Sequence, residues 1–245
     1  MKNTAIIIPT RLNAKRFPNK PLAKIKNLPM ILHVLDRAKE SQAGEVYVAT
    51  PDKEIANVVE AYGGKAFLTK TRHESGSDRI YEVYLEILNN KVDLIINLQG
   101  DMPNIKPKDI LKLEKLMRNN KCEIGTLASP IKNKDEISDR NIVKIEVNKN
   151  LNNDSFIDVV DFFRIKKDLN NTKVYHHIGI YAFTNVALSK YVKLSRSKLE
   201  IERNLEQMRA MENSMMVKTG FTESTPLGVD TEKDLLEVTK EIKLI

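Results

Sequence analysis

The first hundred residues alternate between apolar runs and segments with helical periodicity. Residues 4–9 form an apolar run that ends at a proline, which predicts a strand buried on both faces. In residues 29–41, apolar side chains recur every three to four positions after a proline, which predicts a helix. The alternation continues with these expected elements: strand 45–50, helix 52–62, strand 65–69, helix 79–89 and strand 92–99. Such an order predicts βαβ units and a mainly parallel sheet in an α/β fold.

The pattern changes in the second half of the chain. Segments with strand-like patterning occur at 125–131, 141–148, 156–163 and 176–184, and asparagine-rich turns separate several of them. Helices are expected over 198–212 and 229–242, the second with Thr231 as its N-cap and Asp234 three positions later. We interpret the chain as one domain, 1–245, in which residues from about 130 to 200 belong to an antiparallel extension that serves dimerisation.

The loops that follow the first strands are expected to lie together. In a parallel sheet, ligands bind outside the carboxyl ends of the strands. The loops 9–20, 50–52, 70–79 and 99–103 should therefore share one crevice.

Composition narrows the class of protein. The 245 residues are 41% hydrophobic and 30% charged, as in an ordinary globular protein. The single cysteine, Cys122, cannot form an internal disulfide, and no apolar run approaches the roughly 20 residues that span a bilayer. These features predict a cytoplasmic protein without membrane insertion. The net charge of +7 comes from basic residues interleaved with acids, without a basic, aromatic-rich motif, so nucleic acid is not an expected partner.

The loop after the first strand is the strongest candidate for binding an anion. It carries Arg11, Lys15, Arg16 and Lys20, and Pro18 and Pro21 stiffen it. Arginine offers a two-pronged donor and lysine a mobile charge, which suits a polyphosphate. A solvated basic turn has the same composition, and neither a Walker-type loop nor a GxGxxG pattern is present.

Two aspartates are candidates for a divalent metal. Asp101 follows a buried strand and Gly100, and Asp230 lies where the last helix starts. Together they would supply two carboxylates for a Mg²⁺ ion that keeps several waters. An ordinary Gly-Asp turn at Asp101 and a helix cap at Asp230 are the alternatives.

Two further polar segments stand out. Residues 71–79 contain a Ser-Gly-Ser-Asp-Arg sequence that leads into a helix. One interpretation is that this sequence contacts a ligand, and the alternative is that it only caps the helix through Ser77 or Asp78. His177 and Tyr181 share a face of the strand 176–184, and the alternative for His177 is a buried, hydrogen-bonded histidine.

Taken in order, eight segments resemble the 3-deoxy-manno-octulosonate cytidylyltransferase family, whose members are the CMP-Kdo synthetases of lipopolysaccharide biosynthesis. The segments, which span nearly the whole chain, are IIIPTRLNAKRFPNKPL, YVATPDKEI, RHESGSDR, NLQGDMPNI, NIVKI, HHIGIYAF, LEIERNLEQMRAME and GVDTEKDL. The resemblance implies a Rossmann-like nucleotide-diphospho-sugar transferase fold, a homodimer, and transfer of CMP from CTP to 3-deoxy-D-manno-octulosonate (Kdo). A related acidic sugar, such as 8-amino-Kdo or a nonulosonic acid, is the alternative substrate.

The resemblance also implies site residues. It assigns catalytic roles to Lys20, Arg11, Asp101 and Asp230, with the two aspartates as ligands of Mg²⁺. It places the sugar site in the extension and pairs Arg79 with the sugar carboxylate. The substrate-binding positions that it implies are Pro9, Thr10, Lys15, Arg16, Ser75, Gly76, Arg79, Gln99, His177, Tyr181, Glu206 and Gln207.

The chain departs from the family pattern at several positions. Met102 stands in place of a glutamate, and VVDFFR stands in place of a YFSR-like segment whose arginine contacts the sugar, so Arg164 is only a possible equivalent. The other departures are Thr10, Arg72 and Thr184, which replace an alanine, an aspartate and an arginine. These departures concern the identity of the sugar more than the reaction.

Overall fold

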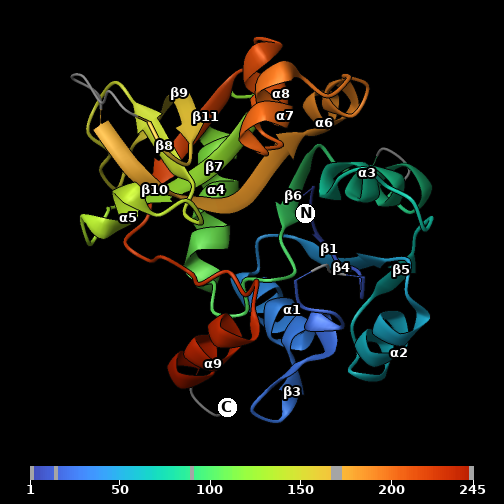
Figure 1. Ribbon diagram of the computed structural model, residues 1–245. Helices are drawn as coiled ribbons and strands as arrows, with labels where there is room; N and C mark the ends of the chain where they lie inside the picture. The colour runs from blue at the N-terminus through green and yellow to red at the C-terminus, as the bar shows by residue number, and fades with distance from the viewer. Residues whose placement is uncertain (1–2, 14–15, 89–90, 167–172, 243–245) are drawn as a thin grey trace. The chain divides into compact units, whose positions relative to one another are not determined.

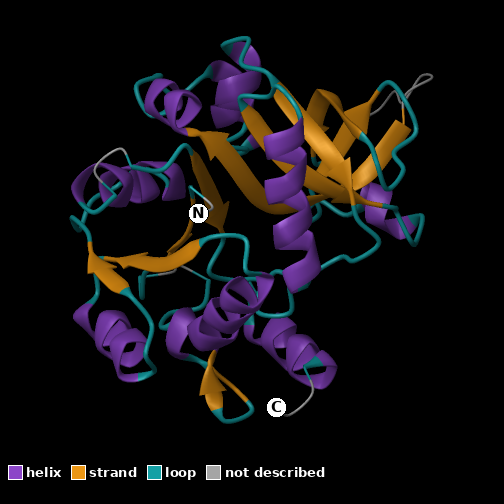
Figure 2. Cartoon of the chain, turned by 180° about the vertical axis from the view of Figure 1, so that it is seen from behind, coloured by secondary structure: helices purple, strands orange, loops and turns teal. Residues whose placement is uncertain are grey.

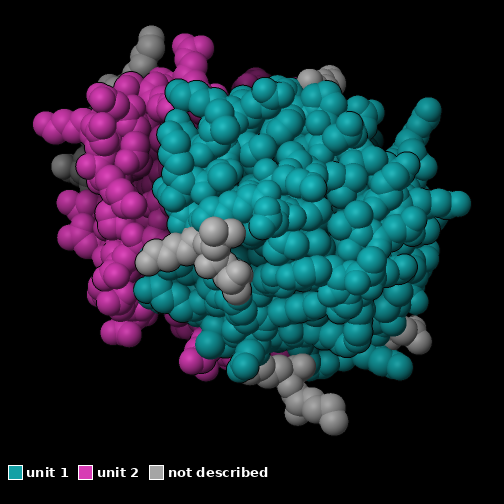
Figure 3. Space-filling view, turned by 90° about the horizontal axis from the view of Figure 1, so that it is seen from below, with its two compact units in different colours: residues 1–112, 226–245 teal, residues 113–225 magenta. Residues whose placement is uncertain are grey.

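A computed structural model describes residues 3–13, 16–88, 91–166 and 173–242 of the chain (Figure 1). Contacts group the chain into two compact units, which are coloured separately in Figure 3. Unit 1 comprises residues 1–112 and 226–245, and unit 2 comprises residues 113–225. The segment from about 130 to 200, interpreted from the sequence as an extension, lies within unit 2.

Unit 1 contains four neighbouring strands in the order β5-β4-β1-β6, and the pairs between them are parallel. All six residues of β1 are buried, as its apolar run predicts. The bounds of β1 and β4 coincide with the prediction, whereas β5 and β6 are shorter than predicted. The strands are β1 (Thr4–Pro9), β4 (Glu45–Thr50), β5 (Ala66–Leu68) and β6 (Leu94–Leu98).

Helices cover both faces of this sheet. In the two opposite views of Figures 1 and 2, α3 lies on one face, and α1 and α2 lie on the other. The helices of this unit are α1 (Met30–Ser41), α2 (Lys53–Ala61), α3 (Gly76–Glu86) and α9 (Glu232–Glu241), with the short elements η1 (Lys20–Leu22), β2 (Lys24–Ile25) and β3 (Leu28–Pro29). The start predicted for α3, residue 79, is wrong, because Ser75 accepts a hydrogen bond from the Asp78 N–H and begins the helix earlier.

A small apolar core ties the last helix to the N-terminal part of unit 1. Ile25, Met30, Val229 and Val238 are fully buried in it, and Phe17 packs against them. The core holds the segment before α9 beside the segment around η1. Loops separated by some 200 residues in sequence are thereby fixed next to each other.

In the described part of unit 2, five strands form a closed circuit. Neighbours follow the order β10-β7-β11-β9-β8, and β8 pairs with β10 as well. The pairs are antiparallel except β7 with β11, which is parallel and was not foreseen because β11 itself was not predicted. The strands are β7 (Ile124–Ser129), β8 (Lys144–Val147), β9 (Phe156–Phe163), β10 (Lys173–Thr184) and β11 (Val217–Phe221).

The helices of unit 2 correct one prediction. Residues 198–212 form two helices rather than one, because Asn204 adopts a left-handed conformation with φ 52° and breaks the run. The helices are α5 (Asp135–Ser138), α6 (Asn185–Tyr191), α7 (Lys198–Arg203) and α8 (Met208–Glu212). The remaining helix, α4 (Pro107–Asn119), was not predicted and includes residues of both units.

Candidate functional site

A cavity of about 350 Å³ lies at the carboxyl ends of β1 and β6 in unit 1. Gly100 permits the close approach that this requires, since a Cβ there would lie 3.2 Å from the Pro9 carbonyl oxygen. The residues that line the cavity are Pro9, Thr10, Arg11, Lys20, Pro21, His73, Glu74, Ser75, Gly76, Arg79, Gln99, Gly100 and Asp101. Its size suits a ligand of nucleotide dimensions.

Three of the four loops predicted to share a crevice line this cavity. The fourth, 50–52, contributes no lining residue and acts as a support instead. The carboxylate of Asp52 accepts the Leu12 N–H at 2.7 Å, while the Thr10 N–H donates to the Ala49 carbonyl at 2.9 Å. The end of β4 therefore holds the start of the cationic loop in place.

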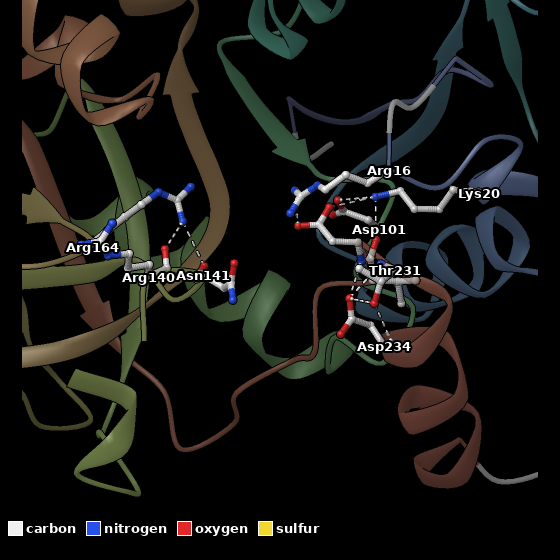
Figure 4. Close-up of polar contacts among 10 residues, drawn as sticks. Arg16, Lys20, Asp101, Arg140, Asn141, Arg164, Thr231 and Asp234 are labelled. Atoms are coloured by element: carbon white, nitrogen blue, oxygen red, sulfur yellow. Dashed lines mark hydrogen bonds and ion pairs between the residues drawn. The ribbon is translucent and has the colours of Figure 1, made fainter. Parts of the chain in front are cut away.

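Lys20 joins the two aspartates that the sequence singled out. Its Nζ lies 3.1 Å from Asp101 Oδ2 and 3.4 Å from Asp230 Oδ1, and it donates to the Val229 carbonyl at 2.6 Å. Figure 4 shows the Lys20 side chain extended toward Asp101. The lysine side chain is 14% exposed, whereas those of Asp101 and Asp230 are 34% and 48% exposed. The two carboxylates are thus ordered by one cation and remain open to solvent.

The first turn of α9 orients Asp230. The carboxylate of Asp234 accepts the N–H groups of Asp230 and Thr231, and Thr231 caps the helix, as predicted (Figure 4). Asp230 therefore does not serve as the helix cap, which was the alternative role for it. Its side chain instead faces Lys20 and Arg16, and Arg16 Nη2 lies 2.8 Å from Asp230 Oδ2.

The donor set suits a hard divalent cation. Mg²⁺ in nucleotide enzymes takes one or two carboxylates, several waters and phosphate oxygens. Asp101 and Asp230 supply two partly exposed carboxylates that converge within reach of one ammonium group. No group of three or more histidine, cysteine, aspartate or glutamate side chains among the residues that the structure describes could hold a metal.

The 70–79 loop gives the cavity a polar wall. Arg79 is 3% exposed, and its Nη1 donates to the Thr69 hydroxyl and the Lys70 carbonyl. Burial, together with the nearby charge of Arg11, lowers the pKa of Arg79. Arg79 therefore lies in the cavity wall with part of its hydrogen bonding already committed. Its pairing with a sugar carboxylate stays a prediction.

Gln99, Arg11 and Arg16 are the remaining described residues of unit 1 that the sequence predicted for the site. Gln99 Nε2 donates to the Asn97 side chain at 3.0 Å, which fixes the amide at the end of β6. Arg11 and Arg16 are both exposed. Lys15, another predicted substrate-binding residue, lies outside the described residues.

His177 in unit 2 is a buried, hydrogen-bonded residue. Its Nε2 lies 3.0 Å from the Thr126 hydroxyl, which in turn lies 2.8 Å from the Ile180 carbonyl. Because a carbonyl can only accept, the hydroxyl donates to it and accepts from His177 Nε2–H. Burial, with a smaller contribution from His176, lowers the pKa of His177 to about 3, so the ring is neutral at physiological pH.

Tyr181 contacts His177 in spite of an irregular strand. The register between β10 and β7 shifts between Ile178 and Tyr181, so simple alternation does not hold there. The two rings nevertheless lie 5.4 Å apart. Burial, together with the charge of Glu206, raises the pKa of Tyr181 well above its ordinary value. The histidine, the tyrosine and the glutamate thus belong to one cluster.

Glu206 and Gln207 lie between α7 and α8. The Tyr191 hydroxyl donates to the Glu206 carbonyl at 2.8 Å and lies 3.4 Å from Glu206 Oε1. Both residues are half-buried. Their positions follow from the break at Asn204 and from contacts that the sequence does not reveal.

The departures from the family pattern have local explanations at two positions. Arg164 Nη1 donates to the carbonyls of Arg140 and Asn141, at 3.0 Å each (Figure 4). The Arg164 guanidinium thus binds the backbone of the segment before β8 in unit 2. Thr184 caps α6 by accepting the Ala187 N–H at 3.1 Å. Met102 is buried, and Arg72 is exposed.

The structure brings the described unit 1 candidates together around one cavity and one ion cluster. The four other candidates belong to unit 2: His177, Tyr181, Glu206 and Gln207. Sequence reasoning missed His73 and Glu74 as lining residues, although they lie in the loop that it selected. It also missed the Val229 carbonyl and Thr126. A backbone acceptor leaves no signal in a sequence, and Thr126 is recognised only once β7 is paired with β10.

Comparisons with known proteins all identify cytidylyltransferases as similar to this chain. A family model described as cytidylyltransferase matches residues 5–219. Relatives named 3-deoxy-manno-octulosonate cytidylyltransferase include those of Bartonella henselae, 41% identical over 236 residues and 96% of each chain, and Thermodesulfovibrio yellowstonii, 43% identical over 242 residues and 95% of each chain.

Solved structures are similar as well. CMP:2-keto-3-deoxy-manno-octonic acid synthetase in complex with CTP matches 98% of both chains with a TM-score of 0.87 and 36% identity. The 4-diphosphocytidyl-2C-methyl-D-erythritol synthase of Anaerococcus prevotii, 14% identical with a TM-score of 0.64, shares the mixed α/β fold. In the described part of the chain, no helix is both long and apolar enough to cross a membrane.

Proposed function

The chain belongs to the family of 3-deoxy-manno-octulosonate cytidylyltransferases, and we propose that it transfers CMP from CTP to Kdo and releases pyrophosphate. The CMP-Kdo that it makes serves lipopolysaccharide biosynthesis. The observation that carries the proposal is the meeting of Lys20 with Asp101 and Asp230 beside the cavity at the carboxyl ends of β1 and β6.

The reaction is a displacement at phosphorus. The anomeric hydroxyl of the sugar attacks the α-phosphorus in line, a new P–O bond forms, the bond from the α-phosphorus to the oxygen bridging to the β-phosphate breaks, and the hydroxyl proton passes to water. Catalysis of this kind depends on positioning and on charge stabilisation. Lys20 and Arg11 stabilise the charge that builds up as pyrophosphate leaves, with Arg16 and Lys15 as helpers.

The nucleotide is bound by the cavity of unit 1. Pro9, Thr10, Ser75, Gly76 and Gln99 surround the base and ribose, and this role is supported by their place in the lining of one cavity. Asp101 and Asp230 would hold Mg²⁺, which neutralises phosphate oxygens when it is bound. Their convergence on Lys20 supports this assignment.

The acidic sugar is bound by residues of unit 2. Tyr181, Glu206 and Gln207 supply groups that face the sugar, and the buried, neutral His177 supports the Tyr181 ring from behind. Support comes from the contact of the two rings and from the electrostatic influence of Glu206 on Tyr181.

A sugar panel tests the function. Pyrophosphate release is measured with CTP and Mg²⁺ in the presence of Kdo, 8-amino-Kdo or a nonulosonic acid. We expect turnover with Kdo and a kcat/KM at least tenfold lower with the other sugars. Equal rates without any sugar, or a preference for a nonulosonic acid, would contradict the proposal.

We also propose that the enzyme is a homodimer of the cytoplasm that associates through unit 2. Unit 2 exposes several large apolar side chains that a second copy of the chain would cover, among them Val160, Ile165, Val186 and Ile201, each at least 40% exposed. Light scattering coupled to size-exclusion chromatography should give about 56 kDa, twice the chain mass of 28.0 kDa. A mass near that of one chain at micromolar concentration would refute the dimer.

A further inference from the structure

Three buried side chains of unit 2 surround the segment that carries Glu206 and Gln207. They are Tyr191 at the end of α6, Glu200 in α7 and Arg209 in α8, and the segment itself joins α7 to α8. Tyr191 is 2% exposed and Arg209 and Glu200 are each 3% exposed. None of the three has a part in the reaction described above.

Glu200 and Arg209 form a two-pronged ion pair. Arg209 Nη2 donates to Glu200 Oε1 at 2.7 Å, and Arg209 Nε donates to Glu200 Oε2 at 2.8 Å. The same carboxylate accepts from Arg196 Nε at 3.1 Å and from the Ser197 N–H at 3.2 Å. Burial raises the pKa of Glu200, but the hydrogen bonds from Arg209, Ser197 and Arg196 outweigh it and hold that pKa below its ordinary value. The pair therefore stays charged and locks α7 to α8.

Arg209 connects this lock to Tyr191. The guanidinium carbon lies 5.1 Å from the centre of the Tyr191 ring, within the range of a cation–π contact. The Tyr191 hydroxyl then donates to the Glu206 carbonyl at 2.8 Å. One continuous set of contacts thus runs from the ion pair to the residue proposed to face the sugar.

The backbone around Glu206 has one defined path. Asn204 is left-handed, and the Leu205 N–H returns to the Glu200 carbonyl at 3.2 Å. The Glu206 carbonyl accepts the Arg209 N–H at 3.1 Å as well as the Tyr191 hydroxyl, so both of its acceptor sites are used. Loss of the hydroxyl would release one of the two bonds that fix this peptide.

We propose that Arg209, Glu200 and Tyr191 form a positioning clamp that holds Glu206 and Gln207 in the geometry needed to use the acidic sugar. The inference rests on the proposed function, in which Glu206 and Gln207 bind that sugar. A positioning group of this kind sets the KM for the sugar and leaves the KM for CTP unchanged, because the nucleotide is bound by unit 1.

Tyr191→Phe is the cleanest test, since it removes one hydroxyl and keeps the ring under Arg209. We expect the KM for Kdo to rise roughly fivefold, the scale of one lost hydrogen bond, and the KM for CTP to stay within about twofold. Tyr175→Phe is the matched control, because the Tyr175 hydroxyl accepts the Leu151 N–H at 2.9 Å elsewhere in unit 2. It should leave both constants unchanged.

A double-mutant cycle separates positioning from a general structural role. In an enzyme carrying Glu206→Ala and Gln207→Ala, Tyr191→Phe should have no further effect on the KM for Kdo. An equal rise in both backgrounds, or an equal loss in the use of CTP, would overturn the clamp.

Arg209→Lys provides a second variant. Lysine keeps a cation beside Glu200 but cannot bind both of its oxygens in a fork, so the KM for Kdo should again rise more than the KM for CTP. A lower melting temperature with unchanged sugar kinetics would show a purely structural ion pair and refute the proposal. Failure of the proposed function is distinct, because it appears in the unmodified enzyme in the sugar panel.

Discussion

Replacing Lys20 with alanine should lower kcat for CMP-Kdo synthesis by about a thousandfold while the chain stays folded. The Lys20 ammonium group touches both Asp101 and Asp230, so its removal takes a positive charge away from the place where we propose that pyrophosphate departs. Stopped-flow or coupled measurement of pyrophosphate release gives kcat, and circular dichroism gives the melting temperature.

The fold should survive because the two carboxylates that Lys20 contacts are partly exposed, so they stay solvated when the ammonium group is removed. Lys24→Ala is a suitable control, since Lys24 is an exposed lysine four positions along the chain. A Lys20→Ala enzyme with near-normal turnover, or one that fails only because it has unfolded, would remove the catalytic role assigned to this residue.

Asp101→Asn and Asp230→Asn should each raise the Mg²⁺ concentration for half-maximal activity at least tenfold. Either change keeps the side-chain shape but removes one of the two charges that a hard cation prefers. Binding of Mn²⁺, followed by its electron paramagnetic resonance signal in the presence of CTP, should weaken in parallel and does not depend on turnover.

Two controls sharpen this experiment. Asp154→Asn changes an exposed aspartate of unit 2 and should leave the metal titration unaltered. Arg16→Gln removes the exposed arginine that pairs with Asp230. Because this arginine would compete with the metal for the Asp230 carboxylate, the variant should bind Mn²⁺ at least as tightly as the unmodified enzyme in the absence of nucleotide. Unchanged metal titrations in both aspartate variants would eliminate the paired-carboxylate site.

The sequence was informative where local chemistry alone decides the structure. The apolar run of β1 and the capping pair Thr231 and Asp234 were both foreseen, because burial and capping follow from neighbouring residues. The position of Asp101 beside the cationic loop followed from the rule for carboxyl ends of parallel strands.

Contacts that depend on strand register or on one unusual backbone torsion could not be predicted from the sequence. Asn204 ends α7 in a run of good helix formers, and only its left-handed φ shows the break. The acceptor of His177, Thr126, becomes a neighbour through a strand pair that contains a register shift. In α4, by contrast, the spacing of Ile110, Leu113 and Met117 did signal a helix that sequence reasoning passed over.

Unit 1 is assembled from two stretches of chain that unit 2 separates. During translation, Asp101 leaves the ribosome 81 residues after Lys20, whereas Asp230 follows Lys20 by 210 residues. The second carboxylate therefore cannot reach Lys20 until all of unit 2 has been synthesised, because Asp230 follows unit 2 in the sequence.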